Sequence, residues 1–228
     1  MQVKSKNTIT LVFCGALIPA VLIIAAALKF QNYLLLSYML IFLTLAPFML
    51  TFEKRKPQAR ELVVISVMIT ACVTGRLAFA MLPGFKPVIA LIIITGLALG
   101  PQAGFMTGAL SALVSNIFMG QGSYTPWQMF SWGLAGLIAG LLMNSRLTKN
   151  VFVLCTLGAI LAYLTGFILD SYSILYSTQN LTKEFIITTY GLGFSFNTIL
   201  AVATALFLLL LAKPILKKFE RLKLKYGI

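Results

Sequence analysis

The chain is dominated by long apolar runs separated by short loops, and this pattern restricts it to few folds. A bilayer core about 30 Å thick needs about 20 helical residues, because an α-helix rises about 1.5 Å per residue. Only 10% of the 228 residues are charged, against about a quarter in ordinary soluble domains. The pattern therefore predicts an all-α, polytopic membrane protein. The expected spans are residues 8–28, 33–52, 62–82, 88–99, 103–119, 126–143, 151–169 and 185–212.

One of these eight segments, 88–99, is too short to cross a membrane alone, because as a helix it is about 18 Å long. We expect it to be tilted, extended through Gly100, or only partly crossing. The polar runs between spans are short, which leaves no room for a separate globular domain. The first segment contains Pro19 and lacks an A-x-A-like cleavage site, so we expect it to be retained as a helix.

Basic residues are distributed unevenly between the two ends of the expected spans. With the amino terminus placed inside, Lys29, Lys86 and Lys183 lie outside, and Arg76 lies within a span. The other fourteen of the eighteen Lys and Arg residues lie inside: Lys4, Lys6, Lys54, Arg55, Lys56, Arg60, Arg146, Lys149, Lys213, Lys217, Lys218, Arg221, Lys223 and Lys225. This bias predicts a multi-pass protein of the cell membrane with both termini cytoplasmic.

The same charge distribution bears on partners. The basic residues lie mostly between and after the spans instead of gathering on one face, so nucleic acid is not an expected partner. The basic tail at 213–225 is expected to contact anionic membrane lipids.

Residues that support catalysis, metal binding or ATP binding are scarce. The chain has no histidine. Cys14, Cys72 and Cys155 lie in apolar segments without C-x-x-C spacing, so we expect no metal, no cofactor and no disulfide. The G-x-x-x-x-G-K-[ST] loop that cradles ATP phosphates is missing, so energy for transport would come from a partner or an ion gradient.

Carboxylates are also few. Glu53, Glu61 and Glu220 lie in basic stretches expected inside, while Asp170 and Glu184 flank an outer loop. Ion-coupled porters hold their cation at membrane depth with carboxylates, and hydrolases need a general base near the substrate. The sequence disfavours both classes, and we expect no enzymatic activity.

Aromatic and amide side chains gather at the expected outer end of the spans. The aromatic set is Tyr33, Tyr38, Tyr124, Trp127, Trp132, Tyr163, Tyr172, Tyr176 and Tyr190, and the amide set is Asn32, Asn116, Gln121, Gln128, Gln179 and Asn180. An aromatic belt at the lipid interface would explain single members, but a belt has two sides and only Tyr226 lies inside. A mouth that binds a small molecule accounts better for the group.

Arg76 lies in the outer third of the segment 62–82, where a guanidinium facing lipid would cost at least about 2 kcal/mol. Under one hypothesis it snorkels outward or pairs with Asp170 to fix helix packing. Under the other it faces the mouth and meets a ligand oxygen. The two can coexist.

Two loops and several small residues shape the expected mouth. PGFKP at 83–87 is a rigid turn, since proline fixes its own φ, and it is expected to carry Phe85 and Lys86 over the mouth. GQGSYTP at 120–126 contains two glycines that favour mobility, which makes it a candidate lid. Small residues four apart let helices approach closely, and one such face is expected to serve a partner. The pairs are Ala71 and Gly75, Gly96 and Gly100, Gly104 and Gly108, and Gly136 and Gly140.

An ordered series of motifs points to a family. It consists of REL at 60–62, PGFKP at 83–87, GPQAGF at 100–105, GALSALVSN at 108–116, GQG at 120–122 and TPWQM at 125–129. The series resembles the substrate-binding S component of an energy-coupling factor (ECF) transporter and is most similar to the cobalamin type. The resemblance covers residues 60–212. It implies a six-helix core with a basic tail at 59–228, preceded at 1–58 by up to two further hydrophobic helices and a basic inner loop.

The resemblance also implies partners and a mechanism. An S component captures a vitamin from outside, docks on a transmembrane coupling subunit (the T component) driven by two ATPase subunits, and topples to bring its pocket to the cytoplasm. The first core helix of the family carries an A-x-x-x-A-like docking face. The nearest match here is Ala71 and Gly75, and the expected docking face also includes the flanking Ser66, Thr70 and Thr74.

The favoured vitamin is cobalamin, because amide, aromatic and cationic side chains suit its amides, faces and phosphate. No histidine is present to ligate its cobalt, so recognition would be peripheral. Riboflavin, thiamine and a queuosine precursor remain alternatives, as do an ion-coupled porter and an intramembrane enzyme. The expected substrate-binding residues are Arg76, Phe85, Lys86, Asn116, Gln121, Tyr124, Trp127, Gln128, Trp132, Asp170, Tyr172 and Tyr190.

Overall fold

The computed structural model describes residues 16–28, 32, 35–36, 38–39, 42–43, 59–145, 148, 150–177 and 182–226. The secondary structure of this part is helical throughout, which confirms the predicted all-α class. The main helices are α2 (Ile18–Ala27), α4 (Ala59–Ala78), α5 (Val88–Leu99), α6 (Pro101–Met119), α7 (Thr125–Leu141), α8 (Val151–Leu175) and α9 (Lys183–Tyr226). Most of the expected span 33–52 and the basic residues at 4, 6 and 54–56 lie outside the described residues.

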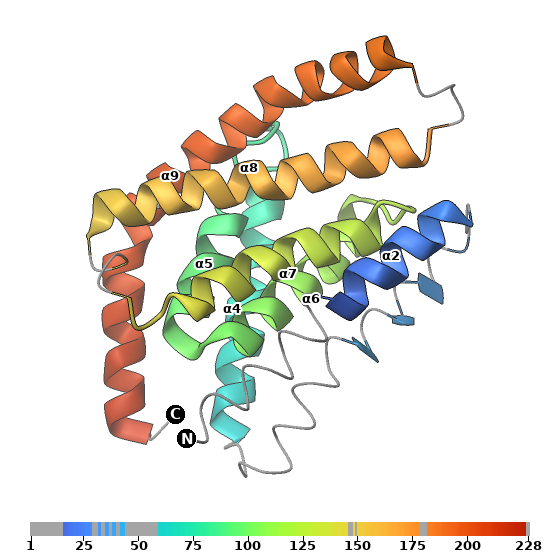
Figure 1. Cartoon of the computed structure of the whole chain (residues 1–228). Helices are drawn as coiled ribbons and strands as arrows, with labels where there is room; N and C mark the ends of the chain where they lie inside the picture. Colours follow the sequence, from blue (N-terminus) through green and yellow to red (C-terminus); the bar gives the residue numbers. More distant parts are fainter. Residues whose placement is uncertain are drawn as a thin grey trace.

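The short helix α5 lies in the centre of the bundle, in contact with α4, α6, α7 and α9 (Figure 1). All of its residues except Leu99 are buried. Gly100 ends it with φ +99°, a conformation that glycine tolerates, and α6 begins at once with Pro101. An apolar helix of about 18 Å can therefore lie inside this protein without spanning the membrane, because other helices and not lipid surround it.

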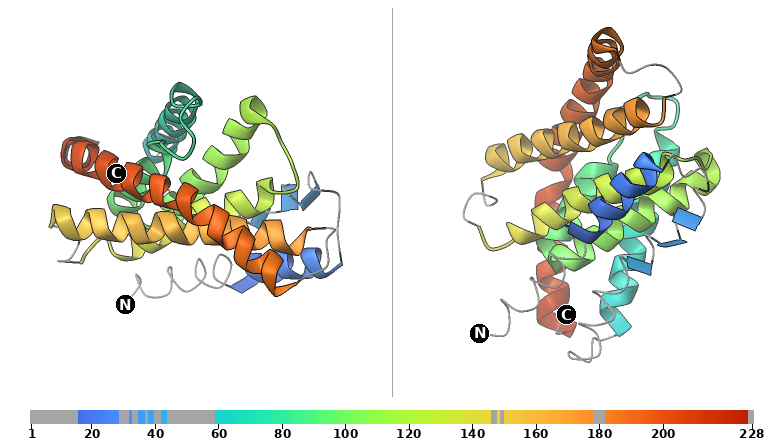
Figure 2. Two further views of the ribbon diagram at one scale, coloured as in Figure 1. Left: turned by 90° about the horizontal axis from the view of Figure 1, so that it is seen from above. Right: turned by 45° about the vertical axis from the view of Figure 1, so that its right-hand side comes forward.

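Three helices carry the apolar outer surface of the protein. α4, α8 and α9 are each long and apolar enough to cross a membrane, with 28%, 33% and 28% of their most hydrophobic windows buried. Large side chains such as Val67, Ile160 and Val202 are 59% exposed on them. The two views in Figure 2 show α8 and α9 side by side on one flank of the bundle. Exposed apolar surface of this extent fits a lipid environment.

Two helices run further than the sequence suggests. α8 continues to Leu175, so Asp170 lies within the helix and does not directly flank the following loop. α9 continues through Pro214 to Tyr226, so the basic tail is helical. The buried Ala212 and Phe219 on either side of Pro214 keep this helix packed against the core. A helix of 44 residues is about 66 Å long and exceeds the membrane core, and Figure 1 shows it changing direction along its length.

Glycines let α5, α6 and α7 approach until their backbones touch. A Cβ on Gly104 would collide with the backbone of Gly136, and a Cβ on Gly136 with that of Gly104. Gly96 faces the Gly136 carbonyl, and Gly140 faces Pro101. The small-residue pairs on α6 and α7 therefore pack against each other inside the protein and do not form an open face for a partner.

We predict that Gly136→Ala destabilises the protein by about 1–3 kcal/mol, because the new methyl group would force α6 and α7 apart. Gly191→Ala on α9 is the matched control, since a Cβ there meets nothing within 4 Å. Thermal unfolding of the two variants in the same detergent measures the difference. Equal midpoints for both would contradict the close packing of α6 and α7.

Candidate functional site

Arg76 lies near the end of α4 with only 8% of its surface exposed. Its Nη1 donates to the Ser115 hydroxyl and, at 2.6 Å, to Asn116 Oδ1, both on α6. Its guanidinium carbon lies 5.1 Å from the centre of the Trp132 ring on α7. The charge is thus held by neutral oxygens and an aromatic face, not directed into lipid.

Asn116 extends this contact to the start of α7. Its Nδ2 donates to Gln128 Oε1 at 2.8 Å and to Thr125 Oγ1 at 3.1 Å. Thr125 Oγ1 donates to Gln121 Oε1 at 2.9 Å, and Gln121 Nε2 donates to the Leu113 carbonyl at 3.0 Å. These side chains join α4, α6 and α7 in one hydrogen-bonded network. We call Arg76, Ser115, Asn116, Gln121, Thr125, Gln128 and Trp132 the polar cluster.

The loop between α6 and α7 closes over the polar cluster. Gly120 leaves α6 with φ +105°, which favours glycine. The Tyr124 hydroxyl donates to the Gly120 carbonyl, and the Ser123 hydroxyl bonds to the Tyr172 hydroxyl on α8. The candidate lid therefore rests on α8, and opening it would break the contact between Ser123 and Tyr172. We call this end of the bundle, which also carries the turn at 79–87, the polar end.

An aromatic wall continues from α7 to α8. The Trp127 and Tyr172 ring centres are 6.1 Å apart, and those of Tyr172 and Tyr176 are 4.9 Å apart. The buried Trp127 indole N–H lies near the Tyr176 hydroxyl without a hydrogen bond of ordinary geometry. This wall places aromatic rings beside the polar cluster.

The turn between α4 and α5 places its two predicted site residues differently. Phe85 packs among Phe79 and Phe207, with ring centres 6.1 and 5.5 Å away, so it joins the packing against α9. Lys86 is half-buried. Burial, together with the nearby charge of Arg76, holds the pKa of the Lys86 ammonium below its ordinary value. Lys86 thus lies within electrostatic reach of Arg76, whereas Phe85 is not part of the polar cluster.

Asp170 and Tyr190 belong to a separate group between α8 and α9. Asn197 Nδ2 donates to Asp170 Oδ2 at 2.8 Å. Tyr190 stacks on Phe167 at 5.0 Å, and its hydroxyl lies 3.0 Å from Ser171 Oγ. The hypothesis that Arg76 pairs with Asp170 is therefore wrong in this structure, because each has another partner.

Three residues that the structure places in or beside the site were not predicted from the sequence. Ser115 and Thr125 belong to the polar cluster, and Asn197 holds Asp170. A signal for Ser115 was available, since Thr107, Ser111 and Ser115 recur every four residues and so share one face of α6. Thr125 and Asn197 gave no such signal, because their partners lie on other helices.

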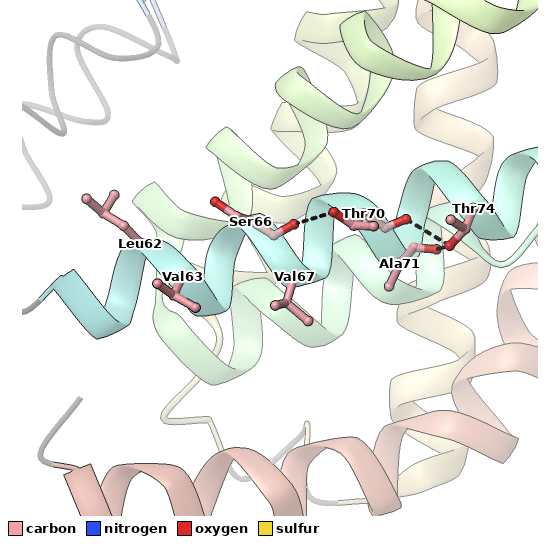
Figure 3. A pocket seen from close by; sticks show the side chains of 7 residues that line it. All are labelled: Leu62, Val63, Ser66, Val67, Thr70, Ala71 and Thr74. Atoms are coloured by element: carbon pink, nitrogen blue, oxygen red, sulfur yellow. Dashed lines mark hydrogen bonds between the residues drawn. The ribbon is translucent and has the colours of Figure 1, made fainter.

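A groove of about 590 Å³ runs along the exposed side of α4 (Figure 3). Its lining is Leu62, Val63, Ser66, Val67, Thr70, Ala71 and Thr74. The Thr70 hydroxyl donates to the Ser66 carbonyl at 2.9 Å, and the Thr74 hydroxyl donates to the Thr70 carbonyl at 2.8 Å. These hydroxyls are satisfied by their own helix, so the groove presents a small, largely apolar surface.

The groove contains four of the five predicted docking residues. Gly75 is the exception, because a Cβ there would lie 2.7 Å from Pro87 Cγ. Gly75 therefore serves the internal contact between α4 and the following turn.

Metal-binding side chains do not gather in the part of the chain that the structure describes. There, no group of three or more His, Cys, Asp and Glu residues is placed to hold a metal ion. The amides, hydroxyls and aromatic faces of the polar end suit hydrogen bonding and stacking with an organic ligand.

Comparison with known proteins decides the family. The family of ECF-type riboflavin transporter S components matches residues 56–218. The chain belongs to this family. The S-component resemblance is thereby confirmed, whereas the match gives no support to cobalamin in particular.

More distant similarity links this S component to UPF0397 proteins. It is 29% identical over 144 residues to a UPF0397 protein of Aliivibrio fischeri strain MJ11, covering 56% of this chain and 76% of the relative. A UPF0397 protein of Aliivibrio salmonicida is equally similar over the same length. No solved structure matches the chain.

We predict that Arg76 and Asn116 are energetically coupled and that Arg76 and Asp170 are not. Because the loss of either partner removes the same buried hydrogen bond to a charged group, Arg76→Ala and Asn116→Ala should share a destabilisation of about 1.5–3 kcal/mol. The double variant should then be little worse than either single variant. Thermal unfolding in detergent measures the double-mutant cycles of Arg76 with Asn116 and of Arg76 with Asp170. In the second cycle the effects of the two substitutions are expected to be additive. Strong coupling of Arg76 to Asp170 would contradict this arrangement.

Proposed function

We propose that this S component is the substrate-binding subunit of an ECF-type vitamin uptake transporter. The observation that carries the proposal is the polar cluster with its aromatic wall, gathered at one end of an apolar bundle. The polar end would face outside, in keeping with the positive-inside bias of the chain. The vitamin would bind there without ATP and be released inward after the S component docks on its coupling subunit.

Cobalamin is the ligand that we propose first. Gln121 and Gln128 offer amides to its peripheral amides, and Trp127 and Tyr172 offer faces to its rings. Riboflavin is the second candidate, because the matching family is described by riboflavin transport. Its flat ring would suit the same aromatic wall.

We predict that the purified chain binds one vitamin without ATP. The test is calorimetric titration of the chain in detergent with cobalamin, riboflavin, thiamine and a queuosine precursor. Both tryptophans of the chain lie at the polar end, so their fluorescence gives an independent readout. Binding of riboflavin but not cobalamin would overturn the first ligand and keep the function. Binding of none would reject vitamin capture.

The groove on α4 is the surface that we propose for the T component of the transporter, which two ATPase subunits would drive. Its small side chains permit close approach of a partner helix, and helix association in lipid depends on such fit. The face consists of Ser66, Thr70, Ala71 and Thr74, with Val63 and Val67 at its edge. Gly75 is not included, because it packs against Pro87.

We predict that Val67→Trp abolishes co-purification with the T component and the ATPases but leaves vitamin binding intact. The bulky ring would fill the groove, which lies on the side of α4 away from Arg76. Val202→Trp on α9 is the matched control, since Val67 and Val202 are both 59% exposed. Normal assembly of the Val67→Trp variant would place the docking surface elsewhere.

The same experiments separate the other function classes. An ion-coupled porter would transport its substrate without the ATPases and respond to an ion gradient. An intramembrane enzyme would consume its substrate and lose activity in Asp170→Ala. Asp170 is engaged by Asn197 and lies beside Gly193, which favours a structural role between α8 and α9.

A further inference from the structure

The guanidinium of Arg76 is held by groups that carry no negative charge. Its recorded hydrogen bonds go to a hydroxyl and an amide oxygen, and its other close neighbour is the Trp132 ring. A buried charge is normally balanced by an opposite charge. Among the described acidic side chains, Asp170 bonds to Asn197 on α9. The positive charge of Arg76 is therefore oriented but not neutralised.

Part of the guanidinium is available to a further partner. Arginine has five N–H donors, and both recorded bonds use Nη1. Nε and Nη2 take part in no hydrogen bond recorded among the described residues, yet neither is a fully buried, unsatisfied atom. These two nitrogens form the edge of the guanidinium that binds two oxygens of a carboxylate or phosphate side by side.

A second cation, Lys86, lies within electrostatic reach of Arg76. Lys86 is half-buried in the turn between α4 and α5, where burial and, to a smaller extent, the charge of Arg76 lower its pKa. Two like charges held close together in a partly desolvated region repel each other. An anionic group bound beside both would relieve that repulsion.

We infer that the ligand of this S component carries an oxyanion, a phosphate or a carboxylate, which Arg76 and Lys86 bind together at the polar end. The inference rests on the proposed vitamin capture and narrows its substrate class. Ser115, Asn116 and Trp132 orient the guanidinium so that its free edge is presented before the ligand arrives. Such preorganisation lowers the entropic cost of binding. A ligand of this class includes cobalamin, through its phosphodiester, and excludes riboflavin in its free form.

Matched ligand pairs test the inference on the purified full-length chain in detergent. Flavin mononucleotide and riboflavin differ in a phosphate, and pantothenate and pantothenol differ in a carboxylate. Cobinamide lacks the whole nucleotide loop of cobalamin, including its phosphodiester, so this third pair is less closely matched. Calorimetric titration should show at least about tenfold tighter binding of the anionic member in the pair that binds. The pair that responds identifies which oxyanion the site takes.

Two variants test whether Arg76 and Lys86 cause the preference for the anionic ligand. Arg76→Gln keeps an amide for Ser115 and Asn116 but removes the charge, and it should reduce the anionic preference to less than about threefold. Lys86→Gln should reduce the preference partially, and its place in a turn leaves the helical network untouched. The exposed Lys183→Gln at the start of α9 is the charge-matched control and should keep the full preference. Thermal unfolding confirms that each variant is folded.

The outcomes distinguish the inference from the function on which it rests. If the wild-type chain binds a neutral vitamin as tightly as its anionic partner, the oxyanion inference is wrong and vitamin capture stands. If Lys86→Gln and a folded Arg76→Gln both keep the full preference, the oxyanion binds elsewhere and the inference is wrong. If the wild-type chain binds no vitamin of the panel, vitamin capture and the inference fail together.

Discussion

The polar end depends on keeping one buried charge satisfied inside an apolar bundle. Arg76 cannot face lipid cheaply, and in this structure it reaches across to Ser115 and Asn116 on α6 and to the Trp132 ring on α7. Asn116 then binds Gln128 at the start of α7. The requirement to solvate one guanidinium thus positions the amides and aromatic faces that a ligand would meet. Removing the charge would loosen three helices together, because they share the same hydrogen bonds.

Close backbone packing below this network makes the arrangement possible. Gly104 and Gly136 bring α6 and α7 into direct contact, and Gly96 admits α5 to the same junction. Such contact gains dispersion energy in lipid, where burial from water no longer drives association. The same packing allows the apolar α5 to be short. Because its neighbours enclose it, its length does not have to match the thickness of the membrane.

The helix α4 serves two surfaces with opposite chemistry. Toward the core it presents Cys72 and Arg76. Toward the outside it presents the groove at Ser66, Thr70 and Thr74, where the Thr70 and Thr74 hydroxyls bond to carbonyls of their own helix. A single rigid helix of 20 residues therefore links the ligand network to the proposed docking face.

The sequence by itself determined the class, the family and most residues of the polar end, because long apolar runs, the charge bias and polar side chains at span ends are local signals. It also indicated that Arg76 needed a partner. Only the tertiary structure decided that the partners are Ser115 and Asn116 and not Asp170, and that Phe85 and Gly75 serve packing. Hydrogen-bond partners on different helices depend on how those helices cross, and a linear pattern of residues does not contain that information.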